Sequence, residues 1–167
     1  MILIESKRLF LREFEPTDAE FLFKLNSDPD VLNLTGDKPF KDVDEARAFL
    51  TNYDQYKKYG YGRWIVLKRS RPEAIGWCGL RYDDNAKATD LGFRFVKDEW
   101  NKGYATESSL AVLEFAKRKF KLPHVIGKAH LENKASQRVL EKIGMKKEGD
   151  SDFDGMPGVI YDYRFKD

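Results

Sequence analysis

A short turn at residues 100–106 carries the residue types expected of a phosphate-binding helix start. It reads Trp-Asn-Lys-Gly-Tyr-Ala-Thr and leads directly into a segment with helical spacing. A helix start leaves backbone N–H groups unpaired at the positive end of the helix dipole, so it can bind a pyrophosphate without a dedicated charged side chain. Gly103 lacks a Cβ, which permits close approach of a phosphate and a positive φ. Lys102 either contacts the phosphate or faces solvent.

A second polar pair, Asn133 and Ser136, follows further along the chain. Asn133 is a favoured residue for capping a helix start. Ser136 shares helical spacing with Val139, Leu140 and Ile143, which places its hydroxyl on the buried stripe of that helix. A buried hydroxyl needs a hydrogen-bond partner. That partner is either a ligand or a nearby backbone carbonyl, and both interpretations remain open.

The composition predicts one soluble globular domain over residues 1–167. The chain is 41% hydrophobic and 35% charged, and it is long enough for one hydrophobic core but short for two. Its 30 basic and 28 acidic residues are well mixed and give a net charge of only +2. There is no basic stripe, so we expect no nucleic acid partner.

The N-terminus and the single cysteine indicate a cytoplasmic protein. The apolar start of the chain meets Glu5, Lys7 and Arg8 too early for a signal peptide or a membrane span, so we expect no membrane partner. Cys78 lies in an apolar run and is expected to be a buried, inert thiol.

Other cofactor classes are disfavoured. The run Gly60-Tyr61-Gly62 lacks the third glycine of a dinucleotide fingerprint, and no Gly-Lys-Ser/Thr phosphate loop occurs. The two histidines and the cysteine do not have metal-ligand spacing, so no metal is expected.

Turn residues divide the chain into segments with strand or helix patterns. Alternating or apolar runs predict strands at residues 8–14, 62–68, 74–82, 88–96, 124–131, 146–153 and 159–165, the second to fourth as an antiparallel meander and the last two as a hairpin. Capping boxes at residues 17–20 and 42–45 predict two helices, the second ending before Gly60. Helical spacing predicts two more, at residues 104–120 and from Asn133 to Gly144.

This order and its motifs resemble the GCN5-related N-acetyltransferase (GNAT) superfamily, and more narrowly the bacterial branch that acetylates ribosomal protein N-termini. The motifs are residues 6–12, 75–80, 91–95, 100–107, 132–136 and 138–145. The resemblance implies an α+β fold with a twisted, mostly antiparallel sheet of about seven strands and about four helices. The superfamily turn usually begins with Arg or Gln. Trp100 takes that place here and removes one cationic contact to phosphate.

The resemblance implies acetyl-CoA as co-substrate and assigns its binding site. The strand before the turn separates from the next strand and pairs its backbone with the pantetheine arm, as an added strand would. The implied binding residues are Arg94, Phe95, Val96, Asn101, Lys102, Gly103, Tyr104, Ala105, Thr106, Asn133 and Ser136. In this branch the serine that matches Ser136 donates a proton to the departing thiolate.

The implied reaction is direct attack by a neutral primary amine in a ternary complex, so a base is useful. Asp90 matches a position that is often acidic in the family, and its alternative is a solvated carboxylate at a strand entry. His130 is a second candidate base, with a structural role as its alternative. Glu107 is expected to complement the helix start or to orient the loop.

The acceptor is the least determined part of the site. It is a protein N-terminal α-amine or a small-molecule amine such as a polyamine, aminoglycoside or amino acid; a non-catalytic CoA-binding module is the further alternative. The protein is expected to be a monomer or a homodimer. The aromatic residues Tyr53, Tyr56, Tyr59, Tyr61 and Trp64 either line the acceptor site or belong to the core. The acidic residues Glu148, Asp150, Asp152 and Asp154 either steer a cationic amine or are simply solvated.

Overall fold

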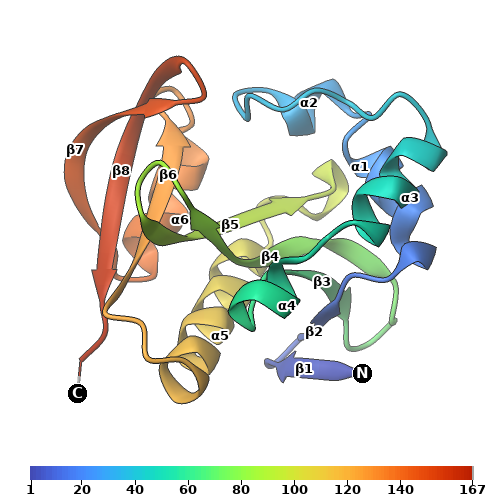
Figure 1. Ribbon diagram of the computed structural model, residues 1–167, viewed down its shortest axis with the longest axis horizontal. Helices are drawn as coiled ribbons and strands as arrows, with labels where there is room; N and C mark the ends of the chain where they lie inside the picture. The colour runs from blue at the N-terminus through green and yellow to red at the C-terminus, as the bar shows by residue number, and fades with distance from the viewer. Residues whose placement is uncertain (167) are drawn as a thin grey trace.

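The strands form one mixed sheet in the computed structural model, which describes residues 1–166 (Figure 1). The sheet has eight strands in the order β1-β2-β3-β4-β5-β6-β8-β7. Neighbouring strands are antiparallel except β5 and β6, which are parallel. The strands are β1 Ile2–Glu5, β2 Leu9–Glu13, β3 Arg63–Lys68, β4 Ala74–Asp83, β5 Ala88–Phe95, β6 His124–His130, β7 Lys146–Phe153 and β8 Met156–Arg164.

The helices form two groups around this sheet. The α-helices are α1 Ala19–Leu25, α2 Pro29–Leu32, α3 Val43–Thr51, α4 Gln55–Tyr59, α5 Tyr104–Lys119 and α6 Lys134–Lys142, and the 3-10 helices are η1 Pro16–Asp18 and η2 Lys97–Glu99. Helices α1, α2 and α3 gather at the right of Figure 1, whereas α6 lies beside β6 at the left. Among residues 1–166, no helix is both long and apolar enough to span a membrane.

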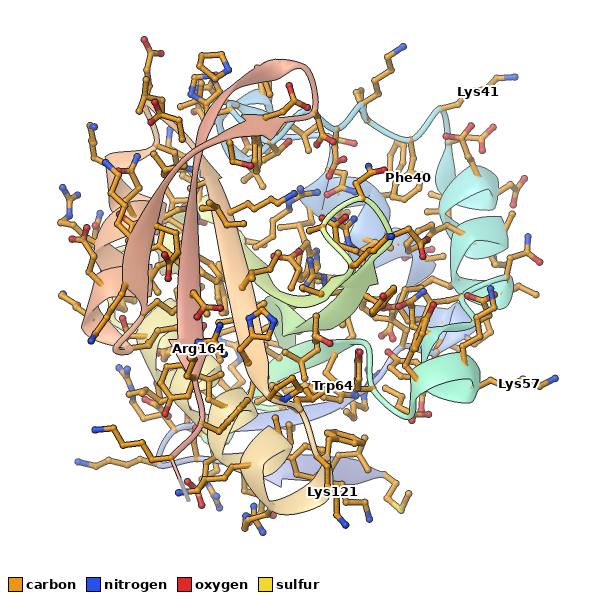
Figure 2. All side chains as sticks on the ribbon, turned by 60° about the vertical axis from the view of Figure 1, so that its left-hand side comes forward. Phe40, Lys41, Lys57, Trp64, Lys121 and Arg164 are labelled. Atoms are coloured by element: carbon orange, nitrogen blue, oxygen red, sulfur yellow. The ribbon has the colours of Figure 1, made fainter. Side chains whose placement is uncertain are left out.

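The largest hydrophobic core lies between α5 and the sheet. Val112, Leu113 and Ala116 of α5 belong to the same buried cluster as Leu80 of β4 and Leu91 of β5. A second buried cluster joins α1 to α3. The charged side chains of Lys41, Lys57 and Lys121 point outward in Figure 2, whereas Trp64 lies inside the molecule with 1% of its surface exposed.

The predicted fold class and the antiparallel meander are confirmed, with one additional strand. Residues 2–5 form β1, which pairs with β2 at the sheet edge. The single helix expected at residues 42–60 is wrong, because the chain breaks it into α3 and α4. Tyr53 lies at the break, where its ring packs edge-on against Phe14 at 5.0 Å and its hydroxyl accepts the N–H of Arg63 at 2.7 Å. These inward contacts are incompatible with one continuous amphipathic helix.

The capping box predicted at residues 17–20 is also wrong. The carboxylate of Asp18 accepts the backbone N–H of Glu15 at 2.8 Å, so the reciprocal cap lies two residues earlier, on η1. Asp18 also accepts two hydrogen bonds from the guanidinium of Arg12, at 2.8 and 2.9 Å. Asp18 is therefore engaged by the preceding strand, and α1 begins without a side-chain cap.

The parallel strands β5 and β6 separate soon after they meet. Their ladder contains one pair, Asp90 with Ile126. Beyond it β5 runs to the right and β6 runs upward in Figure 1. Because hydrogen bonding between them ends there, the C-terminal half of β5 has a free edge facing β6.

Candidate active site

A cleft of about 1320 Å³ opens where β5 and β6 separate. Residues 91–94 of β5, Lys128 and Ala129 of β6, and Asn133 and Ser136 at the start of α6 contribute to its lining. Its rim includes residues 34–40, the β4–β5 turn and the tip of the β7–β8 hairpin. A Cβ at Gly36 would lie 2.9 Å from the Asp154 carboxylate, so the loop before α3 contacts the hairpin tip across the chain.

The turn at residues 100–106 has the backbone geometry expected of an anion-binding site. Gly103 adopts φ +84° at the N-cap of α5, and Asn101 adopts φ +62°. Within residues 1–166, the backbone N–H groups of residues 101–106 donate to no protein acceptor. The indole Nε1 of Trp100 donates to the carbonyl of Phe95 at 2.9 Å. Trp100 therefore fastens the turn to the end of β5.

The backbone of β5 offers free groups slightly earlier in the strand than predicted. The N–H of Val96 donates to Ile75 at 2.9 Å, and its carbonyl accepts the N–H of Glu99 at 3.0 Å, so Val96 has no free donor for a pantetheine arm. Since hydrogen bonding to β4 alternates along the strand, Phe93 and Phe95 direct their N–H groups toward β6. Phe93 lines the cleft, whereas Phe95, Val96 and residues 101–106 lie beyond its lining.

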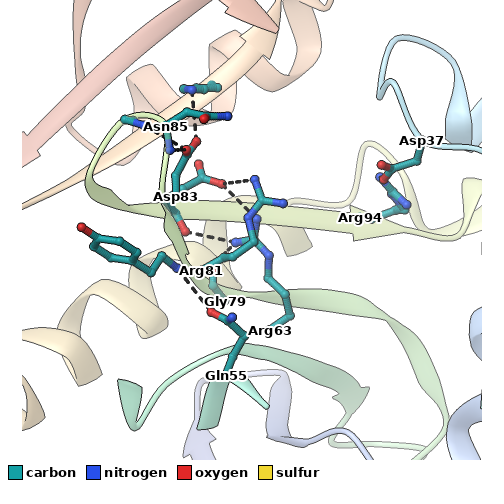
Figure 3. A network of polar contacts seen from close by, with 12 residues as sticks. Asp37, Gln55, Arg63, Gly79, Arg81, Asp83, Asn85 and Arg94 are labelled. Atoms are coloured by element: carbon teal, nitrogen blue, oxygen red, sulfur yellow. Dashed lines mark hydrogen bonds and ion pairs between the residues drawn. The ribbon is translucent and has the colours of Figure 1, made fainter. Parts of the chain in front are cut away.

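Arg94 lines the cleft, but its guanidinium is occupied by hydrogen bonds to other residues of the protein. Its guanidinium donates to Asn26 Oδ1 at 3.0 Å and to Asp37 Oδ2 at 2.6 Å, and it lies 5.3 Å from the ring of Trp77. Figure 3 shows Arg94 meeting Asp37 at the far end of the strand. Arg94 therefore holds the loop before α3 against β5, a role that the sequence did not predict.

Asp90 lies at the cleft floor in a cationic setting. Only 6% of its surface is exposed, so its alternative interpretation as a solvated carboxylate is wrong. Arg63 Nη2 lies 3.0 Å from Asp90 Oδ2 and Arg81 Nη2 lies 3.6 Å from it. Burial raises the pKa of Asp90 above its ordinary value, although both arginines oppose this shift.

Arg63 is a functional candidate that sequence reasoning missed. It reaches over β4 toward β5, and its Nη1 donates to the carbonyl of Gly79 on β4 at 2.7 Å and to that of Asp90 on β5 at 3.1 Å (Figure 3). It is paired in the sheet with Gly79, which in turn pairs with Gly92. Gly79 and Gly92, which fall in the motifs at residues 75–80 and 91–95, could have indicated this arrangement. Two paired glycines leave space over the sheet for a long side chain.

The start of α6 follows the prediction closely. The side chain of Asn133 accepts the backbone N–H of Ser136 at 3.1 Å, so Asn133 is the N-cap. Ser136 is half-buried and lines the cleft. Its hydroxyl has no hydrogen-bond partner among residues 1–166, so local bonding does not occupy it.

The remaining candidates have other surroundings. His130 is buried, its Nδ1 accepts the N–H of Glu132 at 3.0 Å, and it does not line the cleft. Cys78 is buried and burial raises its thiol pKa, as expected of an inert cysteine. Of the five aromatic candidates for the acceptor site only Tyr53 lines the cleft, and of the four acidic hairpin residues only Asp152 and Asp154 do.

Glu107 anchors the first turn of α5 to the β1–β2 hairpin. Its carboxylate accepts hydrogen bonds from Ser6 Oγ at 2.6 Å, from the N–H of Arg8 at 2.8 Å and from Arg8 Nε at 2.6 Å. The N-terminal motif and the turn motif are therefore in direct contact, and Glu107 orients the turn.

Comparison with known proteins identifies this architecture. Residues 8–146 match the family model described as "Acetyltransferase (GNAT) domain". The Bacillus subtilis (strain 168) protein named "Uncharacterized N-acetyltransferase YnaD" is 32% identical over 146 residues, which cover 87% of this chain and 84% of that protein.

Solved structures agree with the sequence match. A GNAT-family acetyltransferase from Bacillus anthracis is 27% identical with a TM-score of 0.82, covering 98% of both chains. The structure titled RimL, a ribosomal L7/L12 alpha-N-protein acetyltransferase in complex with coenzyme A, has a TM-score of 0.81 at 17% identity, again covering 98% of both chains. The chain belongs to the GNAT family of acetyltransferases and is an N-acetyltransferase.

Proposed function

We propose that this protein transfers the acetyl group of acetyl-CoA directly to a primary amine held in the same cleft. The observation that carries the proposal is the unpartnered hydroxyl of Ser136, which lines the cleft beside the free edge of β5. Acetyl-CoA supplies the acetyl group as a thioester. The unpaired N–H groups of residues 101–106 fit its pyrophosphate, and the N–H groups of Phe93 and Phe95 that face β6 fit its amide-bearing pantetheine arm.

Each remaining residue has a role in this proposal. Ser136 donates a proton to the thiolate that leaves, with Asn133 holding the start of α6 in place. Asp90 accepts the proton of the attacking amine, directly or through water, and Arg63 holds the carboxylate at the cleft floor. Because both substrates are bound together, positioning supplies much of the rate enhancement.

The acceptor is proposed to be a protein N-terminal α-amine. This choice rests on the motifs shared with the ribosomal-protein branch and on the fold shared with RimL. Asp152 and Asp154 at the tip of the β7–β8 hairpin add negative charge to the cleft rim, which attracts a cationic amine before it is deprotonated. Polyamines, aminoglycosides and amino acids are the competing small-molecule acceptors.

Thermal unfolding and transfer assays test the proposal. We expect acetyl-CoA to raise the melting temperature much more than NAD or ATP does, because only acetyl-CoA fits both the turn and the free edge. Equal shifts from the three compounds would remove the carrier assignment.

A transfer assay with radiolabelled acetyl-CoA then compares N-terminal peptides with the three small-molecule classes. We expect label in the peptides and none on the protein incubated without acceptor. Exclusive labelling of a small amine would replace the peptide proposal. Binding of acetyl-CoA without transfer to any acceptor would support the non-catalytic module instead.

A further inference from the structure

The start of α5 is surrounded by basic side chains from distant parts of the chain. Lys68 and Lys102 share one carboxylate, that of Glu99, at 2.6 and 3.3 Å. Arg8 approaches from the β1–β2 hairpin and pairs with Glu107. These cations lie at the positive end of a helix dipole, and the three of them share two carboxylates, those of Glu99 and Glu107. An additional anion at this end of the helix would be favourable.

Arg8 is fixed by only part of its hydrogen-bonding capacity. Its backbone N–H and its Nε bind Glu107, and its guanidinium lies 4.4 Å from the ring centre of Tyr104. Nη1 and Nη2 have no hydrogen-bond partner among residues 1–166, and 42% of the side chain is exposed. A role confined to tethering Glu107 would leave these two nitrogens unused.

The free end of Arg8 lies directly at the turn. A Cβ built on Gly103 would be 3.3 Å from Arg8 Nη2, so this nitrogen adjoins the backbone of the N-cap residue. The N–H groups of residues 101–106 begin at the same place. An anion bound there would be within the reach of both the backbone donors and the guanidinium.

We propose that Arg8 is a coenzyme-binding residue that donates through Nη1 and Nη2 to a phosphate of acetyl-CoA. It supplies the cationic contact that Trp100 does not, from a strand hairpin instead of from the turn itself. An arginine held in place by a carboxylate presents its remaining N–H groups in a fixed fork that suits phosphate oxygens. The inference rests on the proposed use of acetyl-CoA and adds a residue to that site.

Arg8→Met tests the proposal, because methionine keeps much of the aliphatic length and removes the charge. We expect the Kd of acetyl-CoA to rise about tenfold or more, as loss of a charge-assisted contact to phosphate implies, with little change in kcat. S-acetyl-pantetheine lacks the phosphates, so the variant and the wild type should use it equally well. Acetyl-dephospho-CoA identifies which phosphate is bound, since a contact to the 3′-phosphate makes the difference vanish with that substrate too.

Arg69→Met is the matched control. Arg69 is equally exposed at 42% and supports the same hairpin by donating to the carbonyl of Ser6 at 2.9 and 3.1 Å, but it has no contact with Gly103. We expect acetyl-CoA affinity to be unchanged in this variant. Equal weakening in both variants, or an equal loss with S-acetyl-pantetheine, would reduce Arg8 to a structural tether.

Folding is monitored by the melting temperature of each variant without ligand. If Arg8→Met does not fold, Arg8→Lys keeps a cation with a different geometry, and we expect its Kd to be raised but to retain a salt dependence as steep as that of the wild type. If Arg8→Lys binds acetyl-CoA as tightly as the wild type does and its affinity no longer depends on salt, the proposal is overturned. Failure of the wild type to bind acetyl-CoA at all would instead overturn the proposed function.

Discussion

The guanidinium of Arg63 lies directly against the backbone of Gly92. A Cβ at Gly92 would be 2.6 Å from Arg63 Nη2, closer than any side chain tolerates. This contact lets a side chain from β3 cross β4 and reach Asp90 on β5, at the point where β5 and β6 separate. The glycine therefore shapes the cleft floor through the arginine that it admits.

Gly92→Ala is expected to destabilise the protein by about 1–3 kcal/mol, as overpacking of a close contact does. Chemical denaturation measures this loss. In an Arg63→Met background the same substitution should cost less, because the clashing guanidinium is gone. Additive losses in the double-mutant cycle would show that the two residues are not coupled.

Ser136→Ala is expected to lower kcat about tenfold to a hundredfold, because the proton donor to the leaving thiolate is lost. The Kd of acetyl-CoA should change less than kcat, since the backbone donors remain. Steady-state kinetics and titration calorimetry separate the two quantities. Ser136→Thr keeps a hydroxyl and should recover part of the activity, whereas unchanged turnover in Ser136→Ala would exclude the residue from catalysis.

Asp90→Asn is expected to lower kcat by about a hundredfold or more and to remove the acidic limb of its pH profile. Activity of the wild type should rise with pH as the Asp90 carboxyl, whose pKa burial raises, loses its proton. Asp84→Asn removes another cleft carboxylate, from the β4–β5 turn, and should keep the limb. If the acidic limb of the pH profile persists in Asp90→Asn, the general base is another residue.

Glu107→Gln is expected to make the free energy of unfolding vary less with pH in the acidic range. Burial alone would raise the pKa of Glu107. The hydrogen bonds from Ser6 and Arg8 together lower it by more, so the net pKa lies below the ordinary value of 4.5. The unfolded chain therefore binds the proton first as pH falls, so the stabilisation is complete above about pH 4.5 and is lost below it.

The free energy of unfolding measures that effect. At neutral pH we expect Glu107→Gln to be about 1–2 kcal/mol less stable than the wild type, and the difference should shrink as pH falls below about 4. Glu114→Gln, on the same helix with 66% of its side chain exposed, should change little. A difference that stays constant with pH would contradict this account.

Local residue preferences were sufficient to predict the backbone geometry at two helix starts. Gly103 was expected to permit a positive φ at a helix start, and Asn133 was expected to cap the helix that carries Ser136. These features depend on residues within one helical turn of each other. The break at Tyr53 was missed because its cause, contact with Phe14 and Arg63, lies outside the helix.

The sequence by itself determined most of the order of helices and strands, the phosphate-type turn and the family, because those depend on periodicity, glycine and local capping. It did not predict β1, α2 or the break between α3 and α4. Only the tertiary structure decided which distant side chains meet. It buried Asp90 beneath Arg63, committed Arg94 to Asp37 and brought Arg8 to Gly103. The physical reason is that these contacts join strands and loops far apart in the chain, whose relative positions follow from sheet register and core packing and not from any local pattern.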